Sequence, residues 1–222
     1  VPEEIRVRLR KEKLRRRKKA ILYAGAAGLV ILAAALILTL FTGRAEAIDS
    51  IAVLPLRNLT GNAEQEYFVD GVTDELIGQL GQISGLRRVI SRTSVMRYKD
   101  TDKSLPEIAQ ELNVDALVEG TVYQIGENVS VKLQLFEALP KERSLWTERY
   151  DRPATEVLVM YCEMARTIAD RIQIKLTADE TSRFAGARPV NTEAYEAYLK
   201  GMSSLLRLNP HDLAVGMHYL ET

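Results

Sequence analysis

The fold of this chain is decided by residues 48–83, IDSIAVLPLRNLTGNAEQEYFVDGVTDELIGQLGQI. The first eight of these residues are a nearly continuous apolar run that contains a proline at its end. That pattern predicts a short strand buried on both faces. After a polar loop, apolar residues recur at helical spacing, at Phe68, Val72, Leu76, Leu80 and Ile83. The segment therefore predicts a buried strand followed by an amphipathic helix.

The following segments continue to alternate between the two periodicities. Strands are expected at 86–90, 114–125, 128–138 and 145–150, with a tight turn at Gly126-Glu127. Helices are expected at 104–112, where Ser104 can cap and Pro106 lies in the first turn, and from Pro153 to about 176. The order β-α-β-α-β-β-β-α predicts an α/β fold, in which a mixed sheet is sandwiched by helices.

A basic tail precedes an uncharged segment at the front of the chain. Residues 1–19 carry ten Lys/Arg against three Glu, and residues 20–42 carry no charge. As a helix, residues 20–42 would be about 34 Å long, enough to cross a bilayer core of roughly 30 Å. Basic flanks stay in the cytoplasm. We expect a single-pass inner or plasma membrane protein with a cytoplasmic tail (1–19), a transmembrane helix (20–42) and an extracytoplasmic part (43–222).

Two further interpretations of this front segment remain open. Ala45-Glu46-Ala47 has the form of a signal-peptide cleavage site, although the apolar run is longer than such peptides need. Ala24 and Gly28 form a small-xxx-small pair that would allow two spans to pack as a homodimer.

The net charge of zero hides an uneven distribution. Residues 43–222 hold 27 Asp/Glu against 20 Lys/Arg. An acidic outer part is a poor nucleic-acid binder, and the basic tail fits lipid headgroups and topology better than nucleic acid. We therefore expect the lipid bilayer as a partner of residues 20–42, and no nucleic acid.

Motifs for catalysis, metal binding or cofactor binding are absent from the sequence. Cys162 is the single cysteine, and the two histidines, His211 and His218, fall near the end of the chain. No phosphate-binding loop is present. Asp70, Asp74 and Glu75 lie near a predicted helix start, where negative charge is favourable; acid/base catalysis of the glycosidase type is the alternative interpretation. We expect no catalytic residue, no metal and no cofactor, and an inert Cys162.

A small basic cluster follows the second predicted strand. It contains Arg92, Arg97 and Tyr98. The simpler interpretation of this cluster is an exposed loop. The more specific interpretation is a docking surface for an acidic partner. Trp146 and Tyr150 are expected to pack in or beside the core rather than to stack on a ligand.

Four segments together resemble a known family. They are IAVLPLRNLTGNAEQEYFVDGVTDELI (51–77), RTSVMRYKD (92–100), IAQELNVDALVEGTVYQIGENVSVKLQLFEA (108–138) and LWTERYDR (145–152). In order and spacing, residues 48–177 resemble the TolB amino-terminal-like domain, which is related to FlgO-like domains. Leu56 stands where that family often has an aromatic residue, and 139–142 lacks its usual glycine turn. The resemblance implies the periplasmic half of a bacterial single-span signalling protein.

Residues after the α/β region are expected to form a linker and then repeats. Ala185-Gly186-Ala187-Arg188-Pro189 predicts a linker over 178–191. Residues 192–222 resemble the start of a tetratricopeptide (TPR) array, a helical hairpin that cannot bury its own apolar face. Its exposed side chains would offer docking positions at Tyr195, Tyr198, Leu205 and Tyr219. Because the chain starts at Val1 and stops at Thr222, we expect a fragment of a longer protein.

Two functions remain open at this point. The first is a membrane-anchored, non-enzymatic sensory or protein-interaction module that binds a protein or peptide. The second is the outer portion of a Ser/Thr protein kinase, a nucleotide cyclase or a winged-helix transcription regulator, whose cytoplasmic effector domain is not in this chain.

Overall fold

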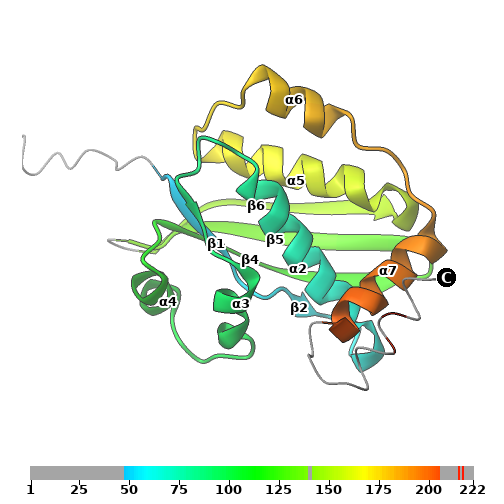
Figure 1. Cartoon of the computed structure of the whole chain (residues 1–222). Coiled ribbons are helices and arrows are strands. Elements are labelled where there is room, and N and C mark those ends of the chain that lie inside the picture. Colours follow the sequence, from blue (N-terminus) through cyan, green and yellow to red (C-terminus); the bar gives the residue numbers. More distant parts are fainter. Residues whose placement is uncertain (1–47, 140–141, 206–214, 216, 218–222) are drawn as a thin grey trace, which may run out of the picture. The chain divides into compact units, whose positions relative to one another are not determined.

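The computed structural model describes residues 48–139, 142–205, 215 and 217 (Figure 1). The chain divides into two compact units, Val1–Glu46 and Ala47–Thr222, and the described residues belong to the second. The strands are β1 (Ser50–Val53), β2 (Arg57–Asn58), β3 (Arg88–Val89), β4 (Ala116–Ile125), β5 (Asn128–Glu137) and β6 (Arg143–Pro153). The helices are α2 (Glu66–Gly81), α3 (Arg92–Val95), α4 (Leu105–Leu112), α5 (Val157–Arg171), α6 (Ala178–Ala185) and α7 (Thr192–Leu205).

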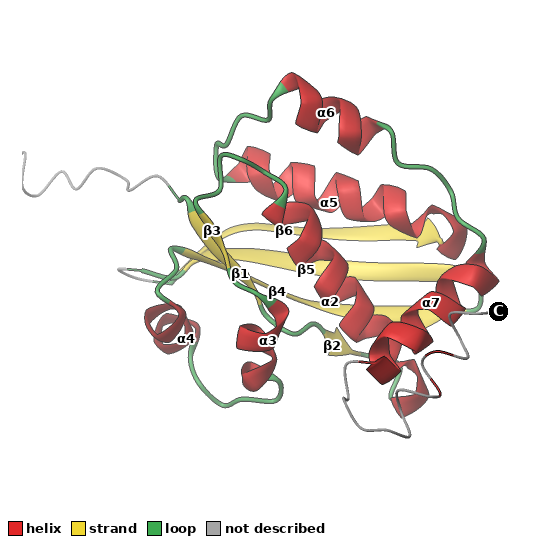
Figure 2. Cartoon of the chain, viewed as in Figure 1, coloured by secondary structure: helices red, strands yellow, loops and turns green. Residues whose placement is uncertain are grey.

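The six strands form one mixed sheet (Figure 2). Their order is β3-β1-β4-β5-β6, with β2 also pairing with β4. β1 is parallel to β3 and β4, whereas β4, β5 and β6 form an antiparallel meander. All four residues of β1 are buried, which confirms the prediction of a strand buried on both faces. The mixed α/β fold expected from the element order is observed.

Helices α2 and α5 cover one face of the sheet, which we call the inner face. Val131 of β5 lies opposite Tyr150 of β6, and both are buried on this face. The helices contribute their apolar stripes to the same core, including Val72, Leu76 and Leu80 from α2 and Met160, Met164 and Ile168 from α5. Trp146 and Tyr150 pack here with ring centroids 6.2 Å apart, so both are packing residues as expected.

The opposite face, here called the outer face, is covered over only part of its width. Two crossover connections run in opposite directions along the sheet: α2 leads from β1 to β3, and α4 leads from β3 past β1 to β4. Because such connections are right-handed, α2 and α4 lie on opposite faces. α4 contacts β4 near its start, where Leu117 is fully buried. Farther along, Lys132, Thr147 and Arg149 are exposed. Within the described residues, helices therefore sandwich the sheet only around β1 and the start of β4.

Several elements differ in extent from the sequence predictions; the strand expected from residues 48–55, for example, covers only Ser50–Val53. The strand expected over 86–90 pairs only through Arg88 and Val89. β6 is longer than 145–150, because pairing with β5 continues along its eleven residues. The helix expected to reach 176 ends at Arg171, since the backbone of Gln173 turns left-handed with φ of 63°. The predicted turn at Gly126 is confirmed, with φ of 59°.

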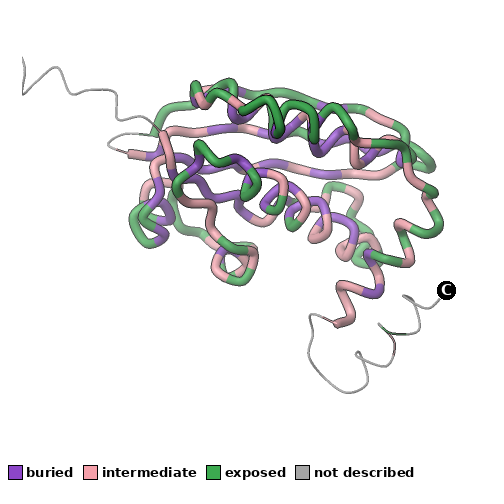
Figure 3. Tube along the Cα trace, turned by 45° about the horizontal axis from the view of Figure 1, so that its top comes forward, coloured by how far each residue is buried: buried purple, intermediate pink, exposed green. Residues whose placement is uncertain are grey.

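Residues 178–191 differ from the expected linker because they contain α6. Thr177 begins this helix with a capping box: its hydroxyl accepts from Glu180 N at 3.2 Å, and its own N–H donates to Glu180 Oε2 at 2.7 Å. Phe184 is buried against the core, while most of the helix is exposed (Figure 3). The Thr-x-x-Glu pattern of a capping box is present in the sequence, but Gly186 and Pro189 after it favoured a linker.

The carboxylate of Glu180 in this capping box should make the stability of the domain depend on pH. Backbone hydrogen bonds from Ser84, at 2.7 Å, and from Thr177 lower the pKa of Glu180 from 4.5 to about 2. A carboxyl whose pKa is lower in the folded state contributes stability above its unfolded pKa and loses it as the pH falls through the folded value. We expect Glu180→Gln to lower the melting temperature at neutral pH, and the difference from wild type to disappear as pH falls from 4.5 toward about 2. Thermal unfolding measures this, with exposed Asp179→Asn as control; a pH-independent difference would contradict it.

Several predicted features lie outside the described residues. They are the tail (1–19), the span (20–42) with Ala24 and Gly28, the cleavage site at 45–47, and Tyr219. In the part of the chain that the structure describes, none of the helices combines the length and apolar character needed to span a bilayer.

Candidate protein-interaction site

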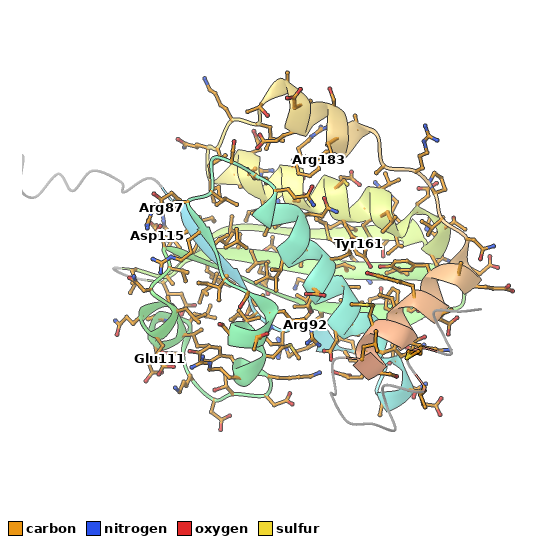
Figure 4. The ribbon with its side chains drawn as sticks, in the orientation of Figure 1. Arg87, Arg92, Glu111, Asp115, Tyr161 and Arg183 are labelled. Atoms are coloured by element: carbon orange, nitrogen blue, oxygen red, sulfur yellow. The ribbon has the colours of Figure 1, made fainter. Side chains whose placement is uncertain are left out.

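Helices α2, α3 and α7 meet around a small surface pocket. Its lining comes from all three helices and comprises Tyr67, Asp70, Gly71, Asp74, Glu75, Arg92, Tyr198, Leu199, Met202 and Ser203. Figure 4 shows Arg92 beside α2. We call this surface the α7 site. It joins residues about 130 positions apart in sequence, through the docking of α7 on α2.

A glycine of α2 lies directly beneath α7. A β-carbon at Gly71 would lie 2.6 Å from Leu199 Cδ2, so the absence of a side chain makes room for Leu199. Leu199 is 5% exposed. Tyr195 donates from its hydroxyl to the hydroxyl of Tyr161 at 3.2 Å, and Tyr161 is fully buried. α7 is therefore attached to the α/β domain by an apolar contact and a buried phenol pair.

Charged side chains beside and within the lining of the α7 site form an ion-pair network. Lys99 Nζ lies 2.6 Å from Glu66 Oε1 and 2.8 Å from Asp70 Oδ1, and Arg92 lies 3.6 Å from Asp70 Oδ2. Burial acts to lower the pKa of Lys99, but hydrogen bonds to Asp70 and Glu66 outweigh it and raise the pKa. Asp70 thus serves as a structural ion-pair partner. The Nε of Arg92 is buried without a hydrogen-bond partner.

The carboxylates of α2 at the α7 site, Asp70, Asp74 and Glu75, border a small space. Burial, and then the neighbouring charge of Asp74, raise the pKa of Glu75. A perturbed carboxyl can mark a functional site. Here the enclosed space is about 30 Å³, the volume of one water molecule, whereas small-molecule sites enclose roughly 300 Å³ or more. The geometry of this pocket fits protruding side chains of a partner at its rim rather than an enclosed substrate.

Outside the α7 site, two kinds of reactive group can be assessed: the thiol of Cys162 and clusters of side chains that could bind a metal. Cys162 is buried, and burial first, with Glu75 adding to it, raises the pKa of its thiol. A thiol of raised pKa is a poor nucleophile at neutral pH. Among the described residues, no three His, Cys, Asp or Glu side chains group as a metal site would require. His211 and His218 lie outside the described residues.

A second hollow is larger but open. It encloses about 960 Å³ between the end of α5 and the following segment. Its charges are mixed in sign, with Arg166 and Arg171 beside Glu148 and Asp170. Because this hollow is open and its charged side chains are of both signs, no class of ligand can be assigned to it.

The structure brings together only part of the predicted docking residues. Arg92 and Tyr198 both line the α7 site, and Tyr198 is 47% exposed. Tyr195 stacks beside Tyr198 but points its hydroxyl inward. Leu205 is half-buried at the end of α7.

The rest of the basic cluster lies elsewhere. Tyr98 is buried and donates to Glu111 Oε2 at 2.8 Å, so it is positioned for packing. Arg97 is exposed over the Tyr98 ring. The sequence analysis missed Tyr67 and Met202 at the α7 site. Helical spacing could have revealed Met202, which follows Tyr198 by four residues, but nothing local indicates Tyr67.

Comparison with known proteins gives one relative in sequence. No protein-family model matches the chain. Putative adenylate cyclase 3 of Rhizobium meliloti (strain 1021) is 35% identical over 160 residues. The match covers 72% of this chain but 27% of that protein, so the chain spans about a quarter of its relative's length.

Solved structures resemble the chain only distantly. Lipoprotein GNA1162 from Neisseria meningitidis is 18% identical, with a TM-score of 0.39 over 55% of this chain and 98% of that one. TolB from Acinetobacter baumannii is also 18% identical, with a TM-score of 0.40 over 58% of this chain and 30% of that one. At this level, the likeness establishes neither a shared family nor a shared activity.

Proposed function

We propose that this chain is a membrane-anchored, non-enzymatic interaction module of a longer bacterial signalling protein. The observation that carries the proposal is the α7 site. Tyr198 is exposed at its rim, Arg92 lines it with a buried Nε that has no hydrogen-bond partner, and its interior offers only about 30 Å³. Aromatic and arginine side chains are enriched in the energetically dominant parts of protein interfaces. A pocket of this shape suits a protein or peptide partner.

Membrane anchoring is part of the proposal and rests on sequence. The basic tail and the uncharged segment 20–42 support a single span with residues 43–222 extracytoplasmic. The TolB-like motif order adds support for a periplasmic location.

The topology predicts the behaviour of a reporter fusion. A reporter enzyme that is active only outside the cytoplasm, fused after Leu205, should be active in cells. The matched fusion after Lys19 should be inactive, because the tail is expected to stay in the cytoplasm. An inactive fusion after Leu205, with the protein present at normal level, would contradict the topology.

The interaction role is tested by site-specific crosslinking in the intact parent protein. A photo-reactive amino acid at Tyr198 should give a discrete adduct with one partner. The same group at exposed Ala185 on α6 should not. An adduct pattern that is the same at both positions, or no adduct from Tyr198, would contradict a partner at the α7 site.

A second function has one observation in its favour. The sequence relative is named a putative adenylate cyclase, and about three quarters of it lies outside the match. We infer as the alternative that these residues are the non-catalytic part of a nucleotide cyclase. Expression of the parent gene should then produce cyclic nucleotide, and deletion of 48–205 should alter its regulation without abolishing synthesis. A parent protein with no cyclase activity would exclude this alternative.

A further inference from the structure

A row of basic side chains crosses the outer face of the sheet. The cross-strand register places Arg57 of β2 beside Thr121 of β4, Thr121 opposite Lys132 of β5, and Lys132 opposite Arg149 of β6. Residues paired in this way lie on the same face, about 5 Å apart. All three basic residues are exposed. We call Arg57, Lys132 and Arg149 the basic row.

The basic row concentrates positive charge at an energetic cost to the sheet. Lys132 and Arg149 are directly opposite, and like charges in this position destabilise a sheet. In the part of the chain that the structure describes, neither Arg57 nor Lys132 forms an ion pair. Arg149 pairs with Asp151, with its Nε 3.4 Å from Oδ1. Arg57 and Lys132 therefore retain positive charge without an ion-pair partner among the described residues.

Arg149 is held in place by the side chains beneath it. Its Nε donates to Ser130 Oγ at 3.0 Å, and its guanidinium carbon lies 5.1 Å from the centre of the Tyr123 ring. Ser130 is 4% exposed, although it lies on the outer face. A guanidinium fixed in this way loses little further entropy when its remaining N–H groups bind a carboxylate.

Exposed apolar side chains lie next to the basic row, as is common where a surface binds a partner. Leu59 and Ile125 are 60% and 70% exposed at the adjoining end of the face. Leu59 N donates to Val122 O, which places this leucine beside β4. Glu119 and Asp151 are the acidic residues on the outer face near the row. The surface thus combines net positive charge with exposed apolar side chains.

We propose that the basic row binds an acidic segment of a protein partner. An anionic membrane is a poorer fit, because residues 43–222 carry seven more acidic than basic side chains and an extended anionic surface would repel them. A short acidic segment responds mainly to charges within a screening length of about 8 Å, which are those of the row. The proposal rests on the interaction role proposed above but uses a surface separate from the α7 site.

The test measures binding of a fluorescent deca-glutamate peptide, in neutral detergent, to the whole chain in which the ten Lys/Arg of residues 1–19 are replaced by Gln, so that the basic tail does not capture the peptide; wild type below means this background. We expect wild type to bind, with affinity falling as salt rises. Double charge reversal, Arg57→Glu with Lys132→Glu, should weaken binding about tenfold, which corresponds to about 1.4 kcal/mol. A matched control, Lys175→Glu with Arg188→Glu, changes net charge equally at exposed positions off the row and should bind nearly as wild type.

The outcomes separate this proposal from the one before it. No binding by wild type, equal weakening by both double variants, or binding to phosphatidylglycerol vesicles in preference to the peptide would each overturn the basic row. Circular dichroism of the variants confirms that exposed substitutions leave the fold intact. Tyr198→Ala should leave peptide binding unchanged, so loss of the crosslink at the α7 site and loss of peptide binding are independent results.

Discussion

Gly120→Ala is expected to destabilise the domain by about 3 kcal/mol, at the upper end of typical overpacking costs. Gly120 lies in β4, opposite Leu133 of β5. A β-carbon at this position would lie 2.2 Å from the carbonyl oxygen of Lys132 and 2.9 Å from Leu133 Cδ2. A flexible side chain could move away, but the backbone of β5 cannot shift without disturbing its pairing with β6. Urea unfolding of the full chain measures the change.

The matched control for this substitution is Gly78→Ala in α2. Open space surrounds Gly78, so an added methyl group meets nothing. Because alanine reduces the entropy of the unfolded chain and favours helix, this variant should be more stable by about 0.5 to 1 kcal/mol. Two Gly→Ala changes in one protein are thus expected to have opposite signs. Destabilisation of similar size at both positions would show that the effect of Gly120→Ala does not come from the close approach of β5 to Gly120.

Local periodicity was sufficient to predict the described strands of the sheet other than β2, which was expected to be part of a polar loop, and the helices α2, α4 and α5 that contact the sheet. The apolar run around Ile51 and the 3.6-residue spacing from Phe68 each reflect a buried face, and burial is what stabilises the element. The pairing of β4 with β5 followed from two β-branched runs joined at Gly126. The predicted boundaries were wrong where long-range pairing decides them, as in β3, where only Arg88 and Val89 lie in register with β1.

The functional surfaces depended on contacts that no local pattern records. Leu199 meets Gly71 although 128 positions separate them, and the periodicity of each helix gives no hint of the other. The basic row requires the register of four strands: Arg57, Lys132 and Arg149 are unremarkable in sequence and align only in the folded sheet. Sequence reasoning identified Arg92 and Tyr198 separately, and the structure shows that they share one pocket.

Leu199→Asp is expected to release α7 from the domain while the sheet stays folded. Leu199 is buried on Gly71, and removing a buried leucine costs about 2 to 5 kcal/mol before the burial of a charge is added. Among the described residues, α7 is also anchored by the hydrogen bonds from Tyr195 to Tyr161 and from Tyr67 to Glu196, and by Lys200 over the Tyr67 ring. The free energy lost with Leu199 should therefore be larger than the stabilisation that the remaining contacts of α7 provide.

Hydrogen exchange of the full chain resolves this release by segment. In wild type, amides of 195–205 should be protected by the docked helix, and in Leu199→Asp they should exchange quickly while β4 and β5 remain protected. Ala194→Asp introduces the same side chain at an exposed position of α7 and should leave protection unchanged. Rapid exchange of 195–205 in wild type would contradict docking, and would favour the helical hairpin with an uncovered apolar face that the sequence predicts. Loss of protection throughout the domain would show that α7 belongs to the cooperative core, because the sheet would then depend on the Leu199 contact for its own stability.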